Sequence, residues 1–222
     1  MSRKPIKKTD ADKAWMQPRQ SKTKRFAPEY HLIVSEGTDT EPNYFGAIKN
    51  IINITYRNRI QLEVVGTGDN TINLFKRAKE LVDTSSYVYK HVWIVYDKDD
   101  FPAEHFDRVD EMCGESSNEE TIYHAVWSNQ CIELWFLLHF SFMQSDLHRN
   151  EYWPKLTECL KKIGKGKYEK NRNDMYEILL PYMDDAICNA KKLEEMNKGK
   201  SPSCSAPGTK VYTFVEYIKA YL

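Results

Sequence analysis

The stretch HLIVSEG at residues 31–37 decides the fold, because a run of apolar residues ends abruptly in an acid and a glycine. A short apolar run rich in β-branched residues and bounded by a turn signal predicts a buried strand. Similar runs follow at 60–66, 91–97 and 121–127, and segments with helical spacing of apolar residues separate them. Strands that alternate with helices predict an α/β fold, here a four-stranded parallel sheet flanked by helices.

The charge distribution divides the chain. Residues 1–25 carry nine basic and two acidic side chains, whereas the rest carries 23 basic and 30 acidic ones. We expect residues 1–27 to form a flexible basic arm, 28–142 the α/β core, and 143–222 a helical extension packed on the core. A basic arm of this kind is typical of nucleic-acid contacts, and a solvated start to the chain explains it equally well.

Apolar periodicity predicts the helices beyond the fourth strand. One is expected at 130–142, directly after that strand, and three more at 150–163, 173–196 and 209–222. The segment 197–208 is rich in Ser, Pro, Cys and Gly and is expected to be a loop.

Cysteine usage and hydropathy bear on the location of the protein. The five cysteines are widely spaced and form no CxxC pair, which is typical of reduced thiols in a cytoplasm. The most apolar stretch, Cys131–Phe140, has only ten residues and includes Glu133 and His139. Because a membrane-spanning helix needs about 20 residues, we expect a cytoplasmic protein without a membrane partner.

Acidic and polar residues follow the predicted strands. Glu36 follows the first, Asp97-Lys98-Asp99-Asp100 ends the third, and Ser128-Asn129 ends the fourth. Because the carboxyl ends of parallel strands meet at one edge of a sheet, we expect these residues to converge there. In extended chain Asp97 and Asp99 point to the same side and could share Mg²⁺, with Mn²⁺ as a substitute. An acidic surface turn is the alternative interpretation.

Three further features have both a functional and a structural interpretation. Glu36 could transfer a proton or join the metal, or it could cap the next helix. Glu133 begins a very apolar helix and could support a metal site or form a salt bridge, and Asn129 could hydrogen-bond a phosphate. A basic stretch could follow a nucleic-acid backbone or form a solvated loop; it includes Lys165, Lys167, Lys170 and Arg172.

Three ordered motifs resemble the RloB family over roughly residues 30–220. They are Ser35-Glu36-Gly37 with Thr40-Glu41-Pro42 and Tyr44-Phe45, then Tyr96-Asp97-Lys98-Asp99-Asp100, then Trp127-Ser128-Asn129 with Cys131, Glu133-Leu134-Trp135 and Leu138-His139-Phe140. The family tail usually reads close to Asn-Pro-Ser-Thr, whereas this chain has Ser205-Ala206-Pro207-Gly208-Thr209. Because of this difference, we do not assign any role of the family's loop to residues 205–209 of this chain.

The resemblance implies a Toprim fold in a prokaryotic protein of abortive-infection and restriction loci, often beside an ATPase gene. By motif, Glu36 is the proton-transfer residue and Asp97 and Asp99 bind Mg²⁺, with Asp100 as a further ligand or a solvated acid. Toprim domains serve several activities, so the resemblance implies a metal site more directly than a reaction.

Three functions follow as hypotheses. The first is a Mg²⁺-dependent nuclease that cleaves DNA or RNA in phage defence. The second is a non-catalytic or partner-controlled effector that docks with an ATPase. The third is a nucleic-acid-binding protein that does not cleave. Whether the chain forms a homo-oligomer is left open.

Overall fold

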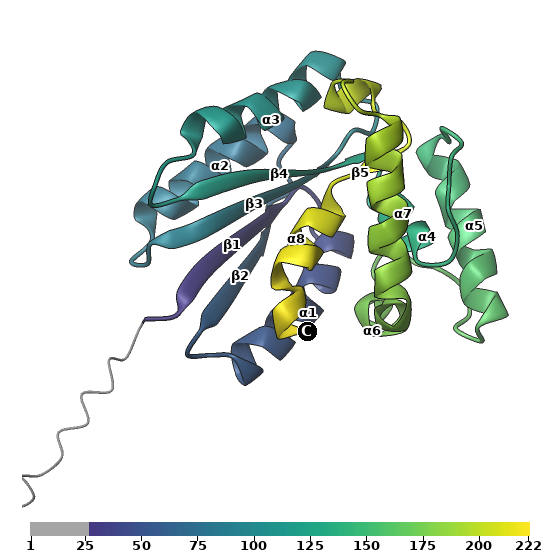
Figure 1. The fold of residues 1–222 in the computed structure, drawn as a ribbon, viewed down its shortest axis with the longest axis horizontal. Helices are drawn as coiled ribbons and strands as arrows, with labels where there is room; N and C mark the ends of the chain where they lie inside the picture. The colour runs from purple at the N-terminus through teal and green to yellow at the C-terminus, as the bar shows by residue number, and fades with distance from the viewer. Residues whose placement is uncertain (1–26) are drawn as a thin grey trace, which may run out of the picture.

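The computed structural model describes residues 27–222, so the predicted basic arm lies outside the described residues except for its last position. One sheet has the strand order β2-β1-β3-β4-β5 (Figure 1). Its strands are β1 (Glu29–Ser35), β2 (Ile60–Gly66), β3 (Tyr89–Asp97), β4 (Ile122–Asn129) and β5 (Gly208–Thr209). The first four pair in parallel, and β5 is antiparallel to β4.

The sheet thus has five strands where four were expected. The four predicted strands all form, within two residues of their predicted ends. The additional strand consists of the last residue of the segment expected to be a loop and the first residue of the helix expected at 209–222. Its two residues are too few for an alternating pattern, and Ser128 and Asn129 pair with them only after the chain has returned from α7.

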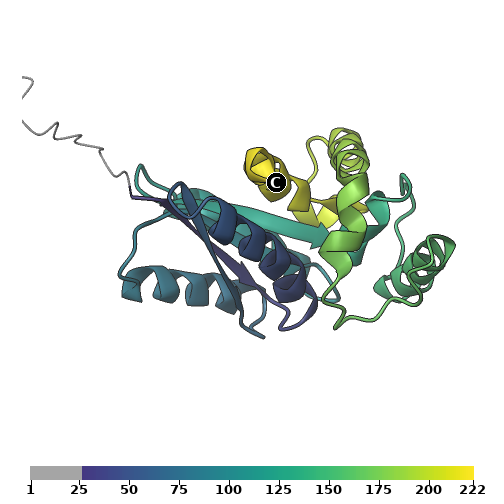
Figure 2. The same ribbon diagram turned by 90° about the horizontal axis from the view of Figure 1, so that it is seen from below.

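Helices cover both faces of the sheet (Figures 1 and 2). They are α1 (Thr40–Thr55), α2 (Thr71–Thr84), α3 (Ala103–Ser116), α4 (Glu133–Leu138), α5 (Arg149–Lys162), α6 (Met175–Leu179), α7 (Met183–Met196) and α8 (Val211–Ile218). Alternate residues of a strand serve opposite faces. Leu32 and Val34 of β1 pack in the core formed with α2 and α3, whereas Ile33 packs in the core that α1 and α4–α8 share.

Three helices differ from the prediction, and the one expected at 209–222 is shortened to the eight residues of α8. The helix expected at 130–142 is limited to α4, six residues long, because an apolar run that is buried all round has no periodicity to mark its ends. The helix expected at 173–196 is divided into α6, a 3₁₀ turn at Leu180–Tyr182, and α7. Pro181 explains this break, because proline cannot donate the hydrogen bond that a continuous helix requires.

The strand order positions the candidate site. From β1 the chain proceeds to β2 on one side, and then returns to place β3 on the other side. In parallel sheets, ligands bind outside the carboxyl ends of the strands at such a reversal. Glu36 directly follows β1 and Asp97 ends β3, so both acids lie at the reversal.

In the described part of the chain, no helix combines the length and the apolar composition that crossing a bilayer requires.

Candidate metal centre

A cavity of about 250 Å³ opens at the carboxyl ends of β1 and β3. Six acidic side chains and one lysine line it: Glu36, Asp39, Glu41, Asp97, Asp99, Glu133 and Lys170. They come from two strand ends, the start of α1, the first turn of α4, and the loop between α5 and α6. The structure therefore brings together Glu36, Asp97, Asp99 and Glu133, which were selected from separate parts of the sequence. We refer to this cavity as the acidic cleft.

Two carboxylate oxygens in the acidic cleft are buried without a partner. Among the described residues, Oε2 of Glu36 and Oδ1 of Asp97 receive no hydrogen bond. The other oxygen of Asp97 accepts one from the backbone N–H of Ile132, at 3.2 Å. A buried carboxylate oxygen without a donor is costly, so each is expected to hold either a proton or a cation.

The electrostatics of the cleft favour protons in the absence of a cation. Burial, with the charges of Asp99 and Glu41 nearby, raises the pKa of Glu36 to about 7. Burial also raises the pKa of Glu41, and it raises the pKa of Asp97 well above its usual range, where Glu41 and Glu133 add to the effect. A bound cation would reverse these shifts, because it favours the charged form of every carboxylate around it.

Asp99 reaches the cleft from a turn and not from an extended strand. β3 ends at Asp97, and Asp99 has a φ of 40°, a left-handed conformation that Asp tolerates better than most residues. Its backbone N–H bonds to the carbonyl of Gln130 at 3.0 Å. Burial raises the pKa of Asp99, and the ion pair with Arg149 opposes that increase. Arg149 was not identified from the sequence.

Glu133 is held in place by two aromatic donors. The hydroxyl of Tyr168 donates to its Oε1 at 2.8 Å, and the indole N–H of Trp153 donates to the same oxygen at 3.0 Å. The salt bridge considered for this residue is not formed within the described residues. Both donors bind one oxygen, so the second oxygen of Glu133 is left for a ligand.

Glu41 is an acid of the cleft that the sequence analysis did not select as a site residue. It is 6% exposed and lies in the first turn of α1, where an acid is usually explained by the helix dipole. A side chain on Gly37 would lie 2.1 Å from the Glu41 carboxylate, so the absence of a side chain there makes the space that Glu41 occupies. The sequence feature that could have identified Glu41 is the first family motif, in which Gly37 precedes Glu41 by four residues.

The basic residues selected from the sequence have different positions. Lys170 lines the acidic cleft, and its ammonium lies 5.0 Å from the centre of the Trp153 ring. Arg172 instead forms an ion pair with Asp174 and donates to two carbonyl groups of its own loop. Those carbonyl groups belong to Lys165 and Lys167, whose side chains are exposed and do not line the cleft.

Asn129 and Asp100, which the sequence also indicated as site residues, lie outside the lining of the acidic cleft. The amide of Asn129 donates to the carbonyls of Pro202 and Ser203, at 3.2 and 3.1 Å, so it holds the loop before β5. Asp100 is exposed, with one oxygen 4.0 Å from Nε2 of His148. Neither residue is among those that line the acidic cleft.

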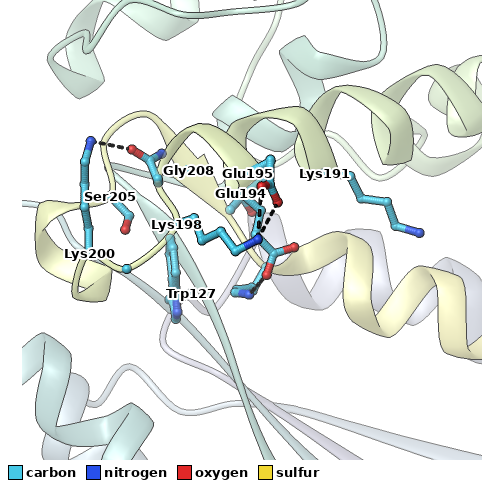
Figure 3. Close-up of a pocket in the computed structure, with 12 residues that line it drawn as sticks. Trp127, Lys191, Glu194, Glu195, Lys198, Lys200, Ser205 and Gly208 are labelled. Carbon is cyan, nitrogen blue, oxygen red and sulfur yellow. Dashed lines mark hydrogen bonds and ion pairs between the residues drawn. The ribbon is translucent and has the colours of Figure 1, made fainter.

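A larger cavity of about 480 Å³ lies near β5 and the end of α7 (Figure 3). Trp127 and four lysines help to line it. Lys198 pairs with Glu195 and Lys210 with Glu194, so these positive charges are already compensated (Figure 3). The acidic cleft is the site with unbalanced charge, because six acidic side chains line it and, within residues 27–222, Lys170 is the one basic side chain in its lining, with Arg149 paired to Asp99 beside it.

The donors of the acidic cleft suit a hard divalent cation. All six acidic side chains offer oxygen, and Mg²⁺ is usually held by one or two carboxylates together with water and substrate phosphates. Glu36, Asp97 and Asp99 could hold such an ion, and Glu41 and Glu133 lie within the same cavity. The two unpartnered oxygens of Glu36 and Asp97 show that the cleft fits a cation, because a cation supplies the partner that these oxygens lack.

Comparison with known proteins identifies one family. The family model described as RloB-like protein matches residues 31–218, nearly the whole described chain. Neither the curated proteins nor the solved structures contain a significant match.

Proposed function

The chain belongs to the RloB-like family, and from that premise we propose that it is a Mg²⁺-dependent, Toprim-like phosphodiesterase that cleaves nucleic acid. One observation carries the proposal: two buried carboxylate oxygens without partners, on Glu36 and Asp97, belong to the same cleft at the strand-order reversal. A cleft of this charge is unfavourable without a cation or bound protons.

The residues of the cleft divide into three roles. Asp97 and Asp99 hold Mg²⁺, with Glu41 and Glu133 available as further ligands. When bound, Mg²⁺ would neutralise charge on the scissile phosphate and lower the pKa of a water molecule. Glu36 moves the proton at its Oε2, because this oxygen has no hydrogen-bond partner among the described residues and is available to accept and return a proton.

Lys170 supplies the positive charge that a phosphodiester requires beside such a cleft. Its loop is anchored to α1, since Thr40 donates to the carbonyl of Lys170 at 3.0 Å and Asn43 donates to the carbonyl of Asn171 at 3.2 Å. The loop is therefore held against the metal ligands. In this proposal Lys170 contacts a phosphate of the nucleic-acid backbone, and Lys165 and Lys167 contact further phosphates of the same nucleic-acid strand.

The cellular role is proposed from the association of the family with abortive-infection and restriction loci. Cleavage of DNA or RNA in a phage-infected cell, under the control of an ATPase partner, would suit that association. Because such control can silence an isolated enzyme, activity without a partner is not the first test.

The first test is metal binding by calorimetry. Wild-type protein is expected to bind Mg²⁺ or Mn²⁺, and Asp97→Asn is expected to lose this binding without loss of the fold. Cleavage of single- and double-stranded DNA and RNA would then be measured with Mg²⁺ for wild type, Asp97→Asn and Glu36→Gln. Cleavage or cell toxicity that survives Asp97→Asn would contradict the enzymatic proposal.

A further inference from the structure

A second cluster of metal-binding side chains lies at the opposite end of the same strands. Glu29 and His31 lie on β1, and His91 lies on β3. The register pairs His31 with His91, and the spacing of two residues places Glu29 on the same face as His31. The cluster is about six residues of strand away from Asp97, roughly 20 Å.

The three ligand atoms are close enough to share one ion. Nε2 of His31 lies 2.8 Å from Oε1 of Glu29, and Nε2 of His91 lies 3.7 Å from the same oxygen. All three atoms lie within 4.8 Å of one another. In a tetrahedral zinc site with bonds of about 2.0–2.1 Å, neighbouring ligand atoms are roughly 3.4 Å apart. We propose that Glu29, His31 and His91 form a Zn²⁺ site, separate from the acidic cleft.

The surroundings of His91 support it as a ligand. Nδ1 of His91 lies 2.8 Å from Nε2 of His124, so the second ring nitrogen has the orienting partner that metal-bound histidines usually have. His124 is itself stacked on Trp93, with ring centres 3.9 Å apart. Nε2 of His91 therefore points at Glu29 in a fixed orientation.

Tyr217 of α8 occupies the fourth position beside the three ligands. Its hydroxyl lies 3.0 Å from Oε1 of Glu29 and 2.9 Å from Nε2 of His91. Tyr217 is 42% exposed, and its ring packs against those of His91 and Trp93, with ring centres 4.7 and 5.5 Å away. Zinc sites with three protein ligands hold a water molecule or a substrate in the fourth position, so Zn²⁺ binding here requires the Tyr217 hydroxyl to move aside or to join the ion.

One existing contact must change on binding. The indole N–H of Trp93 donates to Nδ1 of His31 at 3.3 Å. A metal on Nε2 of the neutral ring places the ring proton on Nδ1, so the hydrogen bond from Trp93 is lost. Because Trp93 also stacks on His124, Zn²⁺ binding is expected to change tryptophan fluorescence, whereas Mg²⁺ binding in the acidic cleft is not expected to reach this residue.

The chemistry of the donors separates the two sites. Imidazole nitrogen suits Zn²⁺ and related transition metals, whereas the all-oxygen acidic cleft suits Mg²⁺. The inference therefore does not depend on the proposed nuclease function, and either can fail alone.

Zinc alone is the probe, titrated into the full chain by calorimetry with excess Mg²⁺ present to occupy the acidic cleft. Wild type and Asp97→Asn are expected to bind one equivalent of Zn²⁺ with a change in tryptophan fluorescence. Glu29→Gln and His91→Asn are expected to weaken that binding about tenfold or more. Tyr217→Phe, which removes the hydroxyl but no ligand, is expected to retain it.

Circular dichroism checks the fold, and Glu29→Gln keeps the test valid if the buried His91 variant does not fold. The side chain of Glu29 is 43% exposed, so its replacement is expected to be tolerated. Co²⁺ provides a second readout, because nitrogen and oxygen ligands give visible bands without the charge-transfer absorption of cysteine thiolates. Absence of Zn²⁺ binding in wild type, or binding that survives Glu29→Gln, would overturn the proposal.

Discussion

Glu36→Gln is expected to stabilise the metal-free protein at pH 8, although it removes a residue that we assign to the reaction. The pKa of Glu36 is raised from 4.5 to about 7, mainly by burial. Between these two values the folded protein keeps a proton that the unfolded chain has released. The contribution of Glu36 to the free energy of unfolding is therefore fully present below about pH 4.5, and it is lost as the pH rises through about 7.

The magnitude follows from the size of the pKa difference. A shift from 4.5 to about 7 corresponds to roughly 3.4 kcal/mol, at about 1.36 kcal/mol per unit. Glu36 is only partly buried, so solvent screening reduces this, and we expect roughly 2 kcal/mol at pH 8. For a chain of this size, that stabilisation raises the unfolding temperature by about 4–8 °C. At pH 5 the stabilisation of Glu36→Gln relative to wild type falls below about 1 kcal/mol.

Thermal unfolding in EDTA, at pH 8 and at pH 5, measures the effect. The exposed Glu120 provides a control, because Glu120→Gln is expected to leave the unfolding temperature unchanged at both pH values. If Glu36→Gln were no more stable than wild type at pH 8, or equally stabilised at both pH values, the electrostatic account of the acidic cleft would be wrong.

Adding Mg²⁺ to the same experiment tests the ligands. An ion at 100 times its dissociation constant stabilises the folded state by about 2.7 kcal/mol. Wild-type protein is then expected to unfold about 5–10 °C higher than in EDTA. Asp97→Asn is expected to show no such increase, and an undiminished increase would exclude Asp97 as a ligand.

Three further predictions concern single residues. Gly37→Ala is expected to displace the Glu41 carboxylate and weaken Mg²⁺ binding in calorimetry, whereas Gly46→Ala, with nothing within 4 Å of the new atom, is expected to leave it unchanged; equal affinities in both variants would remove Glu41 from the site. Burial lowers the pKa of His139 to about 4, so its contribution to stability is present above about pH 6.5 and is lost as pH falls toward 4. In urea unfolding, wild type is therefore expected to lose roughly 3 kcal/mol more between pH 7 and pH 4 than His139→Asn, and equal losses would refute this. Lys170→Ala is expected to weaken nucleic-acid binding and reduce the slope of log affinity against log salt by about 1, and an unchanged slope would show that Lys170 contacts no phosphate.

The sequence alone was sufficient for the four parallel strands and for the acids at their ends. Each strand is a short apolar run with its own turn signal, so it is recognisable without knowledge of its neighbours. The assignment of Glu36 and Asp97 to one edge followed from the rule that parallel strands direct their carboxyl ends to the same side. Their role in metal binding stays a prediction, since nothing yet tests it.

Other features depend on contacts between distant parts of the chain. β5 has no pattern of its own and is a strand only because its two residues pair with Ser128 and Asn129 at the end of β4. Arg172 resembled a phosphate-binding residue in the sequence, but Asp174 and the carbonyls of its own loop engage it. The sequence shows which groups carry charge, but not which of them are already paired.

The acidic cleft shows both contributions. Glu36 and the aspartates follow from local sequence, because they end strands that hydrophobic periodicity defines. Glu41 was not selected, since an acid in a first helical turn is ordinary until the fold buries it against Gly37. Hydrophobic periodicity is a local property that the sequence contains in full, whereas the burial that shifts a pKa arises only when separate segments pack together.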